Sequence, residues 1–153
     1  MTYEGVDAAV SGAPVPSAVP VRFVSVVMAL PSTHPIVVLA EVDEPWRELR
    51  IPVGLPEGAA IAYADQGVES PRPLTHDLFT TALERLGARI EVVRITGLRA
   101  STYLAELECS SPSGRIVLDA RPSDALALAL RSRPRPPITV ATEVLQSMGI
   151  TSA

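Results

Sequence analysis

The sequence predicts an α+β fold built from duplicated strand-strand-strand-helix units, with mostly antiparallel sheets packed on helices. Two observations carry this prediction. Short apolar runs rich in Val and Ile are separated by turn residues, which is typical of strands joined by short connections. Residues 119–131 then combine the end of an apolar strand with the helix-start residues Pro122 and Ser123 and a run of Ala and Leu that is apolar on every face. A helix of this kind must be buried.

The duplication is inferred from two similar stretches. Residues 51–62 align with residues 117–128, so that Pro56 corresponds to Pro122 and Gly58 takes the place of Asp124. Upstream, residues 39–42 resemble residues 104–107 at nearly the same spacing. Chance similarity in a chain rich in Ala, Val and Leu is the competing explanation, because two copies are too few to establish a period.

Local signals place each element in order. Residues 1–20 have neither a helical nor a strand period, so we expect a disordered N-terminal tail before a domain at 21–150, with halves at 21–87 and 88–150. The apolar and β-branched runs predict strands at 21–30, 36–42, 46–53, 88–95, 101–109, 115–119 and 138–140. Capping residues and apolar periodicity predict helices at 56–66, 74–86, 122–131 and 142–148.

Composition limits the classes of function. The net charge of −4 argues against a protein that binds nucleic acid through bulk electrostatics. Residues 1–66 carry three Arg against eight acidic residues, whereas residues 67–153 carry ten Arg against nine, so an anion site belongs in the second half. The single Cys109 allows no intrachain disulfide, and no stretch has the character of a membrane span or signal peptide. We therefore expect a cytoplasmic protein without a membrane partner.

Candidate site residues lie at the predicted helix starts. His76 beside Asp77 is the one His-carboxylate neighbourhood in the sequence, although a capping turn with Thr75 as N-cap and an exposed His is an equally simple interpretation. Glu57 lies in a first helical turn, where the helix dipole stabilises a carboxylate whether or not it takes part in chemistry. Phosphate-loop, nucleophile-elbow and multi-His metal motifs are absent from the sequence, so only carboxylates are left as metal ligands.

Two stretches together form a specific sequence pattern. Residues 72–78 read Arg-Pro-Leu-Thr-His-Asp-Leu, and residues 121–125 read Arg-Pro-Ser-Asp-Ala. Together with residues 49–54 and 57–62 they resemble the bifunctional nuclease domain over about residues 21–145. The chain departs from the usual pattern at Gly58, where Ala usually follows the Glu, at Ser101, where Gly usually precedes Thr102, and in a small insertion at 133–136. The resemblance implies an α+β fold, self-association and hydrolysis of both DNA and RNA.

We therefore expect a nuclease. Because the net charge is −4 and the site is acidic, its activity should depend on a divalent cation such as Mg²⁺ or Mn²⁺, which would neutralise the carboxylates and activate water. The expected catalytic residues are His76, Asp77 and Asp124. The expected substrate-binding residues are Arg72, Thr75, Arg121 and Ser123. The expected metal ligands are Asp77, Asp119, Asp124 and Glu57. The alternative is a non-catalytic oligomeric binding or regulatory module, either one whose charged residues only pair with one another or one that senses a nucleotide or phosphate at a helix N-terminus.

Overall fold

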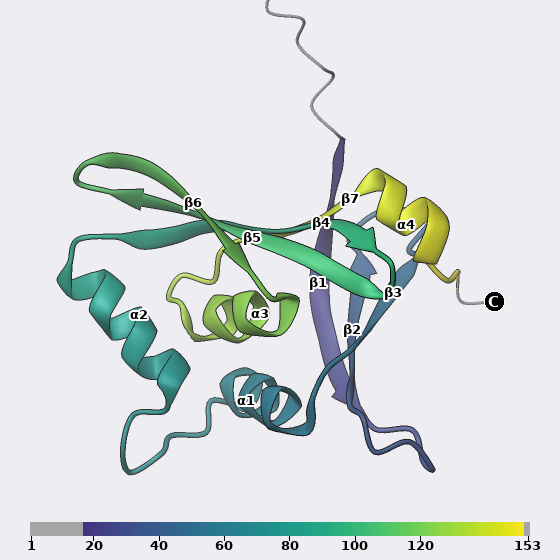
Figure 1. The fold of residues 1–153 in the computed structure, drawn as a ribbon, viewed down its shortest axis with the longest axis horizontal. Helices are drawn as coiled ribbons and strands as arrows, with labels where there is room; N and C mark the ends of the chain where they lie inside the picture. Colours follow the sequence, from purple (N-terminus) through teal and green to yellow (C-terminus); the bar gives the residue numbers. More distant parts are fainter. Residues whose placement is uncertain (1–16, 152–153) are drawn as a thin grey trace, which may run out of the picture.

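The computed structural model describes residues 17–151 and has the predicted α+β fold, with one curved seven-stranded sheet (Figure 1). The strand order is β3-β2-β1-β7-β4-β5-β6, and every neighbouring pair is antiparallel except β4 and β7. The strands are β1 (Ala18–Val27), β2 (Ile36–Glu41), β3 (Glu48–Pro52), β4 (Arg89–Arg99), β5 (Thr102–Ser111), β6 (Gly114–Ala120) and β7 (Ile138–Ala141). The helices are α1 (Leu55–Gln66), α2 (Thr75–Arg85), α3 (Pro122–Arg131) and α4 (Thr142–Met148).

The two predicted strand-strand-strand-helix units are present as β1-β2-β3-α1 and β4-β5-β6-α3. Each set of three strands forms an antiparallel meander, and β7 lies between the first strands of the two sets. The meanders therefore run outward from β7 in opposite directions. They form one continuous sheet rather than two.

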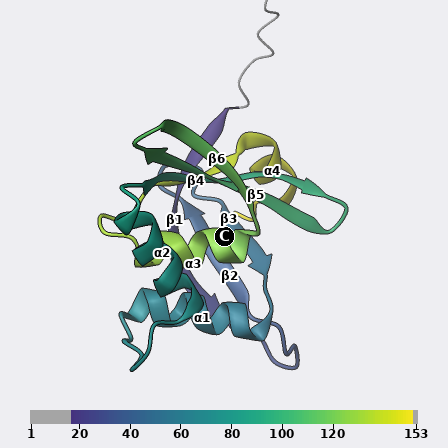
Figure 2. The same ribbon diagram turned by 60° about the vertical axis from the view of Figure 1, so that its left-hand side comes forward.

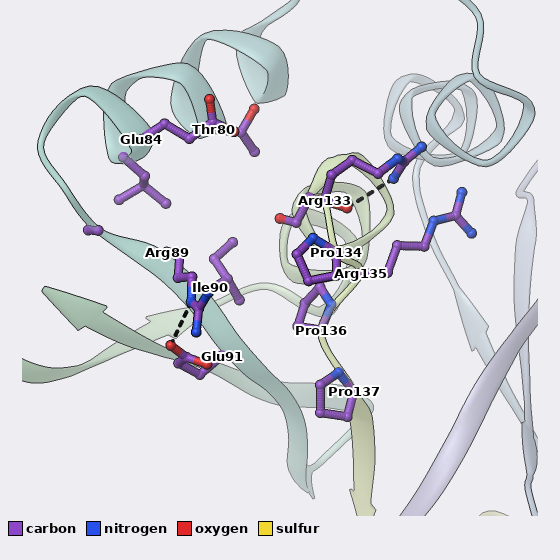
Figure 3. A pocket seen from close by; sticks show the side chains of 13 residues that line it. Thr80, Glu84, Arg89, Ile90, Glu91, Arg133, Pro134, Arg135, Pro136 and Pro137 are labelled. Atoms are coloured by element: carbon purple, nitrogen blue, oxygen red, sulfur yellow. Dashed lines mark hydrogen bonds and ion pairs between the residues drawn. The ribbon is translucent and has the colours of Figure 1, made fainter.

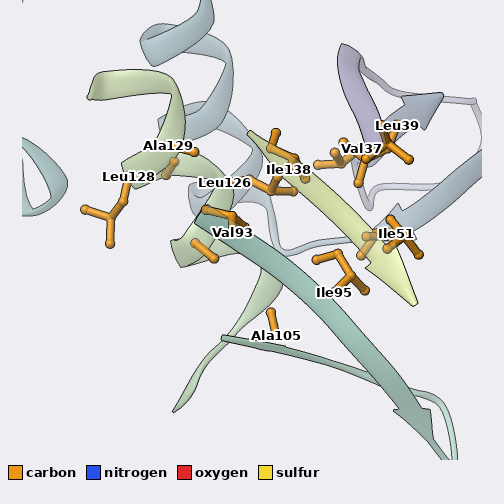
Figure 4. Close-up of a cluster of buried hydrophobic side chains, with 14 of the residues drawn as sticks. Val37, Leu39, Ile51, Val93, Ile95, Ala105, Leu126, Leu128, Ala129 and Ile138 are labelled. Atoms are coloured by element: carbon orange, nitrogen blue, oxygen red, sulfur yellow. The ribbon is translucent and has the colours of Figure 1, made fainter. Parts of the chain in front are cut away.

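The core lies on the concave side of this sheet, around α3. Figures 1 and 2 show α1, α2 and α3 on that side, with α3 between the other two and the sheet. As predicted, α3 is buried along most of its length, and Leu126 is fully inaccessible to solvent. Val93 and Ile95 of β4 and Ile138 of β7 belong with Leu126 to one buried cluster (Figure 4). Burial of one such side chain stabilises the fold by roughly 1.5–3 kcal/mol.

The N-terminal boundary of the domain differs from the prediction. Strand β1 begins at Ala18 and not at Val21, because residues 18–20 pair with residues 139–141 of β7. The predicted tail therefore loses its last three residues to the sheet, and residues 1–16 lie outside the described part of the chain. Within residues 17–151, no helix is both long enough and apolar enough to cross a membrane.

Candidate functional site

The first turn of α3 forms the centre of the candidate site. Arg121 is the N-cap residue in an extended conformation, and Pro122 occupies the first helical position. Because Pro has no N–H to donate and its φ suits a helix start, the strand β6 can turn directly into α3 here. The turn exposes the guanidinium of Arg121 while Ser123 is only 7% exposed.

An ion-pair chain runs from α1 through α3 to α2. The Nε of Arg121 donates to Oδ2 of Asp124 at 2.8 Å, and its Nη1 donates to Oε1 of Glu57 at 3.3 Å. On the other side, Nε2 of His76 lies 3.0 Å from Oδ1 of Asp124. The chain thus brings together one residue from the start of each of the three helices and the N-cap of α3.

The charges in this chain stabilise one another. Chiefly through its hydrogen bond to Arg121, and against the effect of partial burial, the pKa of Asp124 lies below its usual value. The hydrogen bond with Asp124 likewise raises the pKa of Arg121. Because an ionised Asp124 can only accept, a neutral His76 that bonds to it carries its proton on Nε2 and a lone pair on Nδ1. In this tautomer Nδ1 can accept a proton.

A pocket of about 420 Å³ opens beside this chain, between the N-termini of α1 and α3. Glu57, Arg121 and Ser123 line one wall, and Thr102 and Tyr103 of β5 line another. The hydroxyl oxygen of Tyr103 is buried without a hydrogen-bond partner in the described chain. Unpaired helix-start amides and an exposed Arg favour an anion in such a pocket.

Asp77 does not belong to this cluster. Its Oδ2 accepts from the backbone N–H of Leu74 at 2.9 Å, and its Oδ1 accepts from Nε of Arg131 at 2.7 Å. Leu74 is the N-cap of α2 and Thr75 its first residue, so the predicted N-cap role of Thr75 is wrong. Burial acts to raise the pKa of Asp77, but the Leu74 amide and Arg131 outweigh it and the net shift is downward. The geometry of Asp77 is that of a structural carboxylate.

The four predicted metal ligands are not brought together. Within residues 17–151, no three His, Cys, Asp or Glu side chains converge in a way that could hold a metal ion. Glu57 and Asp124 both bind Arg121, Asp77 binds Arg131, and Asp119 lies on β6 opposite Glu106 of β5. Guanidinium groups neutralise three of these carboxylates, and Asp119 does not converge with them, so these residues do not fit a resident divalent metal.

Two predicted substrate-binding residues lie apart from the ion-pair chain. Arg72 and Thr75 are exposed, and their side chains make no hydrogen bond or ion pair with any other described residue. They precede His76 by only a few residues, which keeps them near the surface where α2 begins. No present contact assigns either of them to the site.

Sequence reasoning missed two residues. Arg131 has a side chain only 7% exposed, and it donates to Asp77 and to the backbone oxygen of Ala60 at 2.9 Å. Tyr103 contributes the buried, unpartnered hydroxyl to the pocket. For Arg131, the available signal was a cation at the end of an otherwise apolar helix. For Tyr103 there was no signal, because strand alternation does not indicate an unpaired hydroxyl.

A second pocket, of about 470 Å³, lies between α2, β4 and the loop after α3 (Figure 3). Several prolines of residues 132–137 form one of its walls. Arg133 turns its guanidinium to the backbone oxygens of Leu130 and Ser132, and Arg89 pairs with Glu91 at 2.9 Å. None of the predicted site residues lines this pocket.

Comparison with known proteins identifies a relative and a family for this chain. Over 130 residues, covering 85% of this chain and 76% of the relative, the sequence is 41% identical to an uncharacterized protein of Mycobacterium tuberculosis, Rv1829 in strain H37Rv and MT1877 in strain CDC 1551. The bifunctional nuclease domain matches residues 37–153, a span that includes α1, α2, α3 and every site residue described above. The resemblance found in the sequence is thereby confirmed, and the chain belongs to the bifunctional nuclease domain family.

Proposed function

We propose that this protein hydrolyses phosphodiester bonds of DNA and RNA at the pocket between the N-termini of α1 and α3. The observation that carries the proposal is the chain of contacts Glu57–Arg121–Asp124–His76, of which Glu57 and Arg121 line that pocket while Asp124 binds Arg121 and His76 binds Asp124. It combines an exposed cation for a phosphate with an imidazole whose tautomer is set by a carboxylate. A cytoplasmic location and self-association belong to the same proposal.

Phosphate binding rests on Arg121, Ser123 and the first turn of α3. The side chain of Arg121 is 63% exposed. Its Nε and Nη2 donate to Asp124, so Nη1 is the group that would donate to a phosphate oxygen. The Ser123 hydroxyl lines the pocket, and the helix-start amides add partial positive charge. A phosphate would compete with Glu57 for Arg121, since the contact with Glu57 is the longest in the chain at 3.3 Å.

His76 acts as the general base. Asp124 holds Nε2–H, and Nδ1 takes the proton from an attacking water while a new P–O bond forms and the ester P–O bond breaks. The leaving oxygen takes its proton from solvent. Asp124 stabilises the imidazolium that results, as an ionised carboxylate beside a charged His does in other hydrolases.

The experiment is cleavage of labelled single-stranded DNA and RNA by the purified chain, compared with H76Q and R121A. We expect H76Q to lose at least about 100-fold in kcat while its melting temperature stays near that of the wild type, because the Gln amide reaches the position of Nε2 and can still donate to Asp124. R99A changes an exposed Arg at the far end of β4 and is the control, with unchanged cleavage. An inactive wild type with magnesium, manganese, calcium, zinc or chelator would refute the proposal.

The donor geometry also predicts how the free protein responds to metals. Because no three potential ligands converge within residues 17–151, we expect 1 mM EDTA or an excess of Mg²⁺ or Mn²⁺ to move the melting temperature by less than about 1 °C. Differential scanning fluorimetry measures this directly. A stabilisation of several degrees by one of these ions would reveal a metal site that the described side chains do not form.

A second candidate function is supported by one specific observation. Every carboxylate in the ion-pair chain is already bonded to Arg121 or His76, so the cluster could serve only to join α1, α2 and α3. In that non-catalytic binding module, D124N would lower the stability and no variant would affect cleavage, because the wild type would have none. The cleavage assay and the melting temperature of D124N together separate the two functions.

A further inference from the structure

The two edges of the sheet differ in how they are protected. Edge strand β3 is five residues long, ends in Pro52, and hydrogen-bonds through Glu48 to Ile150 on its outer side. Edge strand β6 is seven residues long, contains neither Pro nor Lys, and pairs with β5 without a register shift. No other described strand lies beyond β6. Natural edge strands usually carry such protection, because an exposed, regular edge pairs with other chains.

The sequence of β6 is complementary to itself in the antiparallel orientation. If two copies pair about Val117, then Arg115 of one copy lies opposite Asp119 of the other, and Ile116 lies opposite Leu118. Residues opposite each other in an antiparallel pair point to the same face, so each Arg meets an Asp and each Ile meets a Leu. A shift of one residue in the register would lose both matches.

Asp119 would gain a cation from this pairing. It lies directly across from Glu106 of β5, and like charges placed opposite each other destabilise a sheet. Arg94 approaches Glu106 at 3.7 Å, but Asp119 has no ion-pair partner anywhere in the described residues. Arg115 of a second copy would supply the missing cation, since its own side chain is 63% exposed and bonds only to Glu108 in the present chain.

Apolar side chains flank the same edge on the concave side of the sheet. Ile116 shares its face with the buried Cys109, yet it is 40% exposed. Helix α2, on that side, has no fully buried residue. Its Leu78 and Phe79 are 62% and 40% exposed, and Leu86, its C-cap residue, is 73% exposed. A second sheet that continues from β6 would cover Ile116 and lie next to this apolar side of the molecule.

We propose that two copies of this chain pair through β6 in an antiparallel arrangement centred on Val117, which joins their sheets into one. The pairing is two-fold symmetric, so the same residues serve on both sides. It gives the self-association of the proposed function a defined surface and register. It does not depend on nuclease activity, since His76, Arg121 and Asp124 lie outside β6.

The first test measures the mass of the full chain by sedimentation velocity at micromolar concentration. We expect about twice the chain mass of 16.2 kDa. D119R places Arg opposite Arg115 of the other copy, so it should raise the dimer Kd at least about tenfold, while its attraction to Glu106 preserves the fold. D43R makes the same charge change in the turn after β2 and should leave the dimer intact. The double variant R115D/D119R restores opposite charges and should restore the dimer.

The second test examines the register. V117C places a thiol at the two-fold axis, where mild oxidation should link two chains, and the native Cys109 is buried and does not compete. V42C, at a similarly exposed site beyond β2, is the control and should stay unlinked. A monomer at micromolar concentration overturns the proposal. So does a dimer that D119R leaves unchanged and that V117C fails to link.

Discussion

Arg131 illustrates how one side chain connects three helices. It lies at the end of α3, binds Asp77 at the start of α2, and donates to the backbone oxygen of Ala60 in α1. Its side chain is only 7% exposed, so its charge depends on these partners for compensation. Arg131 therefore helps to place α2, and with it His76, against α3.

We predict that R131M destabilises the fold. Loss of the guanidinium would leave Asp77 and the Ala60 oxygen without a donor, at a cost of about 2 kcal/mol in the free energy of unfolding, since Asp77 is 39% exposed and water can replace part of the contact. Urea unfolding measures the loss. R135M is the control, because Arg135 and Asp65 are 3.6 Å apart and both about 40% exposed, and it should cost less than about 0.5 kcal/mol. Equal losses in the two variants would contradict this assignment.

Glu108 should govern part of the acid sensitivity. Its hydrogen bonds with Arg115 and then Arg94 lower its pKa from 4.5 to about 2. A carboxylate with a lowered pKa in the folded state adds stability that is complete above pH 4.5 and disappears as the pH falls toward 2. We expect the melting temperature of E108Q to fall less than that of the wild type between pH 6 and pH 3. E143Q, on the exposed side of α4, should follow the wild-type curve.

Residue types and spacing identified part of the candidate site. Arg121, Ser123 and Asp124 stand at a helix start that the sequence marks clearly, and the structure brings His76 and Glu57 to them. The separation of Asp77 from this cluster could not be predicted. It depends on the direction in which the first turn of α2 faces, and neighbouring residues on a helix point about 100° apart. The partner Arg131 is 54 residues away in sequence.

At the scale of elements, capping and periodicity gave the helices and strands within a few residues. Gly67 ends α1 in a left-handed conformation with φ of 65°, as its position after the apolar run indicated. The position of β7 was not predictable in the same way. Four apolar residues mark a strand but do not specify its neighbours, and β7 lies in the centre of the sheet, antiparallel to β1 and parallel to β4.

Gly58 has a packing reason that the pattern of the family did not reveal. A Cβ at this position of α1 would lie 2.8 Å from both Cβ and Cγ of Pro35, which is buried in the turn before β2. That distance is well inside normal carbon contact. The rigid Pro35 ring therefore favours Gly here.

We predict that G58A lowers stability although Ala is the better helix former. The gain in helix propensity is about 1 kcal/mol, whereas overpacking against a rigid ring costs about 1–3 kcal/mol, so the net effect should be a loss of up to about 2 kcal/mol. P35A removes the ring that the new Cβ would meet. G58A should therefore lower the stability less in the P35A background than in the wild type. Additive effects in this double-mutant cycle would show that the two sites do not interact.

At the scale of the whole molecule, residues near both ends of the described chain hydrogen-bond to the sheet or to the segment next to it. Strand β1 pairs with β7 over residues 18–21, and the backbone oxygen of Ser17 accepts from the N–H of Thr142 at 2.9 Å. Near the other end, Ile150 bonds to Glu48 on the outer edge of β3. The two meanders are thus joined by segments far apart in sequence, which local patterns in the sequence could not specify.

Two N-terminal truncations should differ in melting temperature. The sequence of residues 1–16 lacks the apolar period needed to offset its ordering entropy, so we expect that deleting these residues leaves the melting temperature unchanged. Deletion of residues 1–20 also removes three of the four β1 residues paired with β7, the Ser17 contact, and the Pro20 oxygen that accepts from Val42. Several backbone hydrogen bonds at about 1 kcal/mol each should lower the melting temperature by more than about 5 °C, at about 2–4 °C per kcal/mol for a chain of this size. Thermal melts of both variants test this, and equal melting temperatures would mean that β1 contributes nothing to stability before Val21.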